Sequence, residues 1–220
     1  MILAPGATLA QELVELRSGV LAMGSMVEQT IGEAMRALIE RDTDLARGVI
    51  VGDHEVNELH RRLREHCFNV IAAYQPVSPG DLRLIFSFQH IVLELERMAD
   101  HATHVARAAI RLNELPPLPA NDRLQEMTAV TQAQVAEILK AVVDANEDLA
   151  RQIASRDDEV DVLYRQLWNG LIGSMADPLN VARAAVLLFV AKDLERIADR
   201  VTNIAEDVVF LHTGHVVELG

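Results

Sequence analysis

Residues 95–109 read LERMADHATHVARAA, and residues 194–208 read LERIADRVTNIAEDV. Leu, Glu, Arg, Ala, Asp and Thr recur in the same places, 99 positions apart. In each copy the Glu and the Asp are separated by four residues, so on a helix they lie one turn apart, on the shoulder of an apolar stripe. The sequence therefore predicts a duplicated helix with a pair of carboxylates in each copy, Glu96 with Asp100 and Glu195 with Asp199.

Long stretches on both sides of these phrases have the periodicity of helices. Apolar residues recur in steps of three and four from Leu9 to Leu38 and from Leu124 to Leu149. The prolines fall in only four places, and proline breaks helix interiors. These signals predict an all-α protein with six long helices, at residues 8–41, 43–75, 80–114, 120–146, 148–176 and 179–212.

The duplication extends over a whole domain. The second and third predicted helices of the first half match those of the second half at offsets of 104 and 99 residues. We therefore predict two tandem, pseudo-symmetric three-helix bundles, residues 1–115 and 120–220, linked by Leu115–Pro119. Within each half, we expect the first helix to end where residues that can cap the next helix begin. These residues lie in Arg41-Asp42-Thr43-Asp44 in the first half and in Asn146-Glu147-Asp148 in the second.

Composition excludes several classes of protein. The formal net charge is −13, whereas nucleic acids and anionic membrane surfaces select basic proteins. The N-terminal stretch MILAPGATLAQELVELR lacks the basic start of a signal peptide, and the apolar run Ala184–Ala191 is too short to span a bilayer. A single cysteine, Cys67, fits a reducing compartment. We expect a cytoplasmic protein that neither binds nucleic acid nor inserts into a membrane.

A second set of polar residues repeats as well. Asp53 and Asp157 occupy equivalent places in otherwise apolar stripes, where a carboxylate is costly unless it is paired or bound to a metal. Asn57 and Asp161 follow one turn later. If these helices face the duplicated phrase, each half offers four oxygen ligands, which suit Mg²⁺, Mn²⁺ or ferric iron. The predicted metal sites are Asp53, Asn57, Glu96 and Asp100 in one half and Asp157, Asp161, Glu195 and Asp199 in the other.

Two other interpretations of these acids remain open. The same spacing occurs on many solvated helices, so the acids could form a purely structural polar network in a helical scaffold. They could also serve a metal-dependent helical enzyme or a metal-storage protein. His101 and His104 lie beside the first motif, but the second copy has Arg200 and Asn203, so a shared mechanism cannot need imidazole at both sites. Because no catalytic constellation is recognisable, the sequence favours a non-enzymatic regulator or adaptor.

Several segments together resemble one known family. They are ERMAD at 96–100, ERIAD at 195–199, DTDLARGVI at 42–50, AAYQPVSPGDLRLI at 72–85 and NIAEDVVFLHTG at 203–214. In this order they resemble the PhoU family of bacterial phosphate-signalling regulators over nearly the whole chain from about Leu9. The family usually has Gly where this chain has Ala99 and Ala198, and it tends to have His where this chain has Arg200.

The resemblance implies a negative regulator of the phosphate-starvation response. Such a protein acts between the ATPase subunit of the phosphate ABC transporter and a phosphate-sensing histidine kinase, and it restrains phosphate uptake. It further implies a homodimer, held near the inner face of the membrane only through its partners. The acidic motifs are implied to bind metal ions, and no other cofactor is expected to be required.

Overall fold

The computed structural model describes residues 7–116 and 122–219, and every regular element in these ranges is helical. Residues 1–6, 117–121 and 220 lie outside these ranges, and with them the predicted starts of both domains, most of the linker and the predicted end of the second domain. The first half contains α1 (Leu9–Glu40), α2 (Thr43–Ala73) and α3 (Pro79–Asn113). The second half contains α4 (Asp122–Asp144), α5 (Glu147–Ala154), α6 (Asp157–Ser174), the short 3₁₀ helix η1 (Pro178–Asn180) and α7 (Val181–Thr213).

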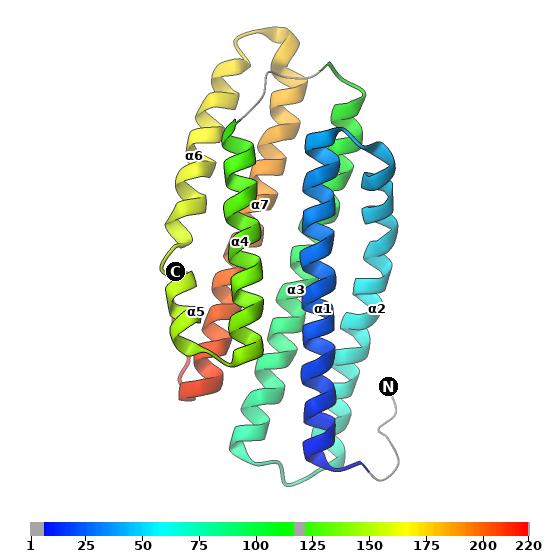
Figure 1. Cartoon of the computed structure of the whole chain (residues 1–220), viewed down its shortest axis with the longest axis vertical. Helices are drawn as coiled ribbons and strands as arrows, with labels where there is room; N and C mark the ends of the chain where they lie inside the picture. Colours follow the sequence, from blue (N-terminus) through cyan, green and yellow to red (C-terminus); the bar gives the residue numbers. More distant parts are fainter. Residues whose placement is uncertain (1–6, 117–121, 220) are drawn as a thin grey trace.

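The helices form the two predicted three-helix bundles. In the first half α1, α2 and α3 pack against one another, and in the second half α4, α6 and α7 do so, with α5 continuing the line of α6 (Figure 1). The predicted all-α fold of two tandem bundles is thus confirmed. The division into domains at 1–115 and 120–220 stays a prediction, because the buried apolar residues of both halves form one continuous core.

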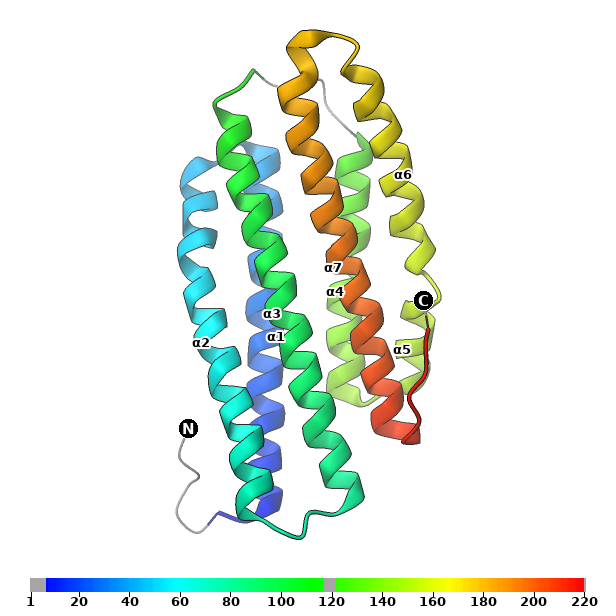
Figure 2. The same cartoon turned by 180° about the vertical axis from the view of Figure 1, so that it is seen from behind.

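Two helix pairs join the bundles. The long helices α3 and α7 lie side by side in the middle of the molecule (Figure 2), and α1 contacts α4. Gly24 of α1 faces Leu139 of α4, where a Cβ atom would lie 2.6 Å from the Leu139 Cδ2 atom. Glycine therefore permits a close approach of these two helices, while α3 and α7 make the larger contact.

The breaks after the first helix of each half form as the sequence predicts. Arg41 and Ala145 take left-handed backbone conformations, with φ of 57° and 48°. Asp42 then caps α2, since its Oδ1 accepts from the backbone N–H groups of Asp44 and Leu45 at 3.0 and 2.9 Å. Asn146 caps α5 in the same way, so the two halves repeat even the chemistry of this turn.

The fifth predicted helix, 148–176, is present as two helices, α5 and α6. At the break, the Ser155 hydroxyl donates to the carbonyl of Gln152 at 2.8 Å. The Arg156 carbonyl accepts from Gln134 of α4 at 3.1 Å, and the Arg156 guanidinium pairs with Glu137 of the same helix. The Arg156 carbonyl also accepts from the backbone N–H of Glu159 at 3.0 Å, so Gln134 of α4 shares this acceptor with the start of α6. Helix α6 begins at Asp157, one of the predicted ligands.

Candidate functional site

The first predicted site lies between α2 and α3. Both oxygens of Asp53 accept hydrogen bonds: Asn57 Nδ2 donates to Oδ2 at 2.9 Å, and Thr103 Oγ1 of α3 donates to Oδ1 at 3.3 Å. Asp53 and Asn57 are half-buried, so the helix contact does not hide them from solvent. The structure thus brings the α2 residues of this set against the helix that carries Glu96 and Asp100.

The second predicted site repeats the central contact. Thr202 Oγ1 of α7 donates to Asp157 Oδ1 of α6 at 3.0 Å. Thr202 is 99 positions after Thr103, and Asp157 is 104 positions after Asp53, which are the offsets of the duplication. The repeated threonine therefore positions the repeated aspartate. This role was missed in the sequence, although the recurrence of Thr in the duplicated phrase was the signal for it.

Like charges crowd the first site. Burial, followed by repulsion from Asp100 and Asp53, raises the pKa of the Glu96 carboxyl. His60 of α2 also faces it, with Nδ1 at 3.8 Å from Glu96 Oε1, and burial lowers the pKa of this imidazole. His60 is a neighbour that the sequence did not identify. Asp53, Glu96 and Asp100 thus share one electrostatic environment across two helices.

The second site is crowded in the same way. Burial and repulsion from Asp157 and Glu195 raise the pKa of Asp161, while burial and repulsion from Glu195 raise the pKa of Asp199. Two basic side chains of α7 offset part of this charge. Lys192 Nζ lies 2.5 Å from Glu195 Oε2, and Arg196 Nη1 donates to Asp199 Oδ2 at 2.9 Å.

The predicted ligands face one another without forming a closed coordination shell. Among the residues that the structure describes, no three carboxylates of either set have oxygens within 4.8 Å of one another. A cation in either site would therefore require side chains to turn inward from their present hydrogen-bond and ion-pair partners. The assignment of these eight residues as metal ligands stays a prediction.

A buried acid that the sequence did not single out crosses between the bundles. Glu94 of α3 is 0% exposed, and Arg97 Nη1 donates to its Oε1 at 2.9 Å. Its other oxygen, Oε2, accepts from two side chains of α7, Arg200 Nη1 at 3.2 Å and Asn203 Nδ2 at 2.9 Å. Arg200 thus has a defined partner, and Glu94 ties the first bundle to the second.

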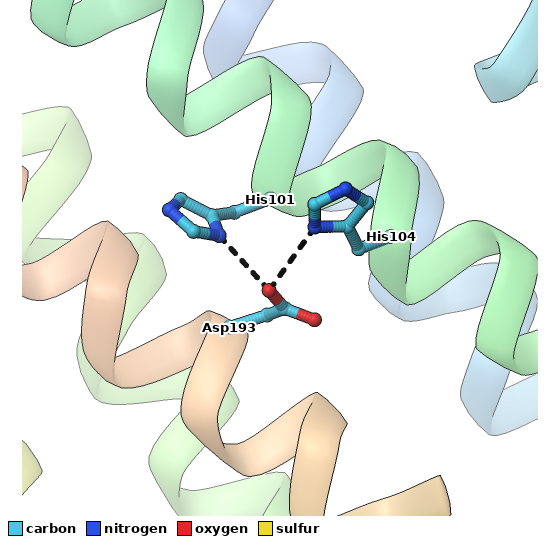
Figure 3. Close-up of side chains that lie close together, drawn as sticks. All are labelled: His101, His104 and Asp193. Atoms are coloured by element: carbon cyan, nitrogen blue, oxygen red, sulfur yellow. Dashed lines mark hydrogen bonds and ion pairs between the residues drawn. The ribbon is translucent and has the colours of Figure 1, made fainter.

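The same contact occurs in reverse. Asp193, which is 99 positions after Glu94, lies on α7 and meets two side chains of α3 (Figure 3). Its Oδ1 lies 2.9 Å from His101 Nδ1 and 3.3 Å from His104 Nδ1. His101 and His104 are in turn 99 positions before Arg200 and Asn203. The α3–α7 contact is therefore pseudo-twofold, with an acid of each repeat facing the same two positions of the other.

A further histidine crosses this contact without a counterpart in the other repeat. His90 Nδ1 of α3 lies 2.6 Å from Asp207 Oδ2 of α7. The hydrogen bond to Asp207 raises the pKa of His90, and burial raises the pKa of Asp207 to about 6. Three acid contacts, at Glu94, Asp193 and Asp207, thus hold α3 against α7.

Comparison with known proteins matches both repeats. A family model described as PhoU domain covers residues 20–109 and 124–208. The chain is 37% identical to a phosphate-specific transport system accessory protein PhoU homolog from Clostridium acetobutylicum, over 94% of this chain and 95% of that protein. The crystal structure of PhoU from Pseudomonas aeruginosa superposes with a TM-score of 0.91 at 36% identity, covering 94% of this chain and 100% of that one. PhoU from Streptococcus pneumoniae gives a TM-score of 0.88 at 30% identity, covering 96% and 99%.

Proposed function

This chain belongs to the PhoU family, and from this we propose that it is an accessory regulator of a phosphate-specific transport system. The observation that carries the proposal is the extent of the match. Both repeats are covered, and the chain spans 95% of the Clostridium acetobutylicum relative, whose name describes this accessory role. The relatives are named as accessory proteins, so the metal-dependent enzyme or storage protein is not favoured.

We further propose that the protein restrains phosphate uptake by coupling the transporter ATPase subunit to a phosphate-sensing histidine kinase. The names of the relatives support such a role, since they describe accessory and regulatory proteins of phosphate transport. None of the described helices has the length and apolar character needed to cross a membrane. Contact with the membrane would then pass through the partners, and a cytoplasmic homodimer is part of the same proposal.

Deleting the gene tests this function directly. In phosphate-rich medium, a strain that lacks the protein is expected to express a reporter for phosphate-uptake genes several-fold above wild type. The reason is that the proposed brake on the histidine kinase is gone. Deleting the kinase as well should restore the low level. A reporter that stays repressed, in a strain with no second homologue, would contradict the proposal.

The two acidic sites are proposed to bind hard cations, such as Mg²⁺, Mn²⁺ or ferric iron. The donor set fits, because each site offers carboxylate oxygens from two helices, and these carboxylates repel one another. A bound cation would relieve this repulsion and would present a positive centre on an acidic protein. Such a centre could attract phosphate or a carboxylate of a partner.

Thermal unfolding measures this binding. Wild type is expected to unfold at a higher temperature with Mg²⁺, Mn²⁺ or Fe³⁺ than with chelator, since a cation at 100 times its Kd adds about 2.7 kcal/mol. Asp199→Asn should reduce the rise, because it removes one negative charge from the second acidic site. The matched control is Glu159→Gln, an exposed acid on α6. A midpoint that no metal moves would rule out the cation sites.

A further inference from the structure

We propose that His101, His104 and Asp193 form a separate metal site that joins the two bundles and takes a borderline transition metal of the Zn²⁺ class. The site lies between α3 and α7, whereas each acidic site belongs to one bundle. The three ligand atoms, two imidazole nitrogens and one carboxylate oxygen, all lie within 4.8 Å of one another. The proposal does not depend on the proposed function.

The arrangement is close to what an ion requires. His101 and His104 are three residues apart on one helix, so their side chains are neighbours on the same face. Both Nδ1 atoms point at the same oxygen of Asp193, at 2.9 and 3.3 Å (Figure 3). Donors held about 2.0–2.1 Å from a tetrahedral Zn²⁺ lie roughly 3.4 Å apart. The two nitrogen–oxygen separations are thus already within about half an ångström of this value, and the third separation, between the two imidazoles, is within 4.8 Å.

The donor types select the metal. Two imidazole nitrogens and a carboxylate suit Zn²⁺, Co²⁺, Ni²⁺ or Cu²⁺, whereas Mg²⁺ and Ca²⁺ prefer oxygen alone. Three protein ligands also leave a fourth position for water or for a ligand atom of another molecule. The His104 side chain is 52% exposed, and the side chains of His101 and Asp193 are 23% and 17% exposed, so solvent reaches the site from one side.

Neighbouring basic groups are engaged with other acids. Arg97 and Arg200 both bind Glu94, and Lys192 contacts Glu195. The net charge of the chain, −13, further favours the arrival of a cation.

In the free protein, an oxygen of Asp193 accepts hydrogen bonds from the imidazoles of His101 and His104. A metal would replace these hydrogen bonds by coordination to the same nitrogens, each imidazole then keeping its proton on Nε2.

The pseudo-twofold contact supplies a natural comparison within the same molecule. At the equivalent positions Glu94 faces Arg200 and Asn203, and neither a guanidinium nor an amide nitrogen is a metal ligand. At this end of the α3–α7 contact, Glu94 and Arg200 form an ion pair. The two repeats have therefore diverged, and of these two ends only the one formed by His101, His104 and Asp193 places imidazole nitrogens beside the acid.

Zinc binding to the purified, chelator-stripped full-length protein tests the site. Wild type should bind Zn²⁺ at least tenfold more tightly than the double variant His101→Arg/His104→Asn, in competition with a chromophoric indicator. This variant copies the residues that already face an acid at the other end of the contact, so the fold has a precedent for it. Asp193→Asn, which keeps an oxygen acceptor, should lose the same binding. Addition of Zn²⁺ should raise the unfolding temperature of wild type but not of these variants.

Two controls locate the effect. His90→Gln removes another histidine of the α3–α7 contact, and Glu159→Gln removes an exposed acid of α6 that belongs to no proposed site. Both are expected to keep the zinc binding of wild type. In wild type, Co²⁺ should give the visible absorption of a nitrogen-ligated site, and the double variant should lose it. If the double variant and Asp193→Asn bind Zn²⁺ as wild type does, or if either control loses as much as they do, the proposal is wrong.

Discussion

Glu94→Leu is expected to destabilise the protein by about 3–5 kcal/mol, the usual cost of removing one partner of a buried ion pair. Glu94 is 0% exposed and is bound from both helices of the central contact. Its loss leaves Arg200, whose side chain is only 17% exposed, beside an apolar group. Urea unfolding measures the free-energy change, and a shift of this size is a large part of the stability of a typical domain.

The control for this prediction is two residues away. Glu96→Leu replaces an acid of the same helix with a side chain exposure of 23%, and its nearest basic group, His60, is 3.8 Å away. It should cost much less than Glu94→Leu. The double variant Glu94→Leu/Arg200→Leu should recover much of the loss, since an apolar pair can replace a buried ion pair at little cost. Equal effects of the two single variants would show that Glu94 does not hold the bundles together.

Local chemistry explains which features could be predicted from the sequence. The caps at Asp42 and Asn146 depend only on adjacent residues, and both form as expected. The helical period and the repeat offsets predict the helical segments and the pairing of the halves, apart from the break between α5 and α6. The hydrogen bond between Thr103 and Asp53 has a counterpart between Thr202 and Asp157. The offsets predict this counterpart once the helices are known to face each other.

Features that depend on contacts between the elements could not be predicted in this way. At the break between α5 and α6, Arg156 contacts Gln134 and Glu137 of another helix. Glu94 falls between apolar residues of α3, but only the packing of α7 on α3 shows that its position is buried. Attention to the repeated carboxylates favoured Glu96, which is partly exposed, over the fully buried Glu94.

The second large effect is expected where α1 meets α2. Glu12 and His66 are each 1% exposed, and Glu12 Oε2 lies 2.6 Å from His66 Nε2. Glu12 Oε1 and His66 Nδ1 have no hydrogen-bond partner among the described residues. The pair therefore depends on a single hydrogen bond, and the only other acid grouped with it is the exposed Glu15, among the described residues. Replacing either Glu12 or His66 should lower the free energy of unfolding by about 1–3 kcal/mol, because the other side chain is left buried without its hydrogen bond.

A double-mutant cycle separates this pair from simple loss of packing. Glu12→Leu and His66→Phe should each destabilise the protein in urea, while the double variant should be more stable than the sum of the two predicts, by about 0.5–3 kcal/mol. Glu28→Leu is the matched control, since Glu28 is an exposed acid of the same helix, sixteen residues away from Glu12. It should change the stability by no more than about 0.5 kcal/mol. If the two single effects simply add, Glu12 and His66 act independently, and the buried contact does not stabilise the first bundle.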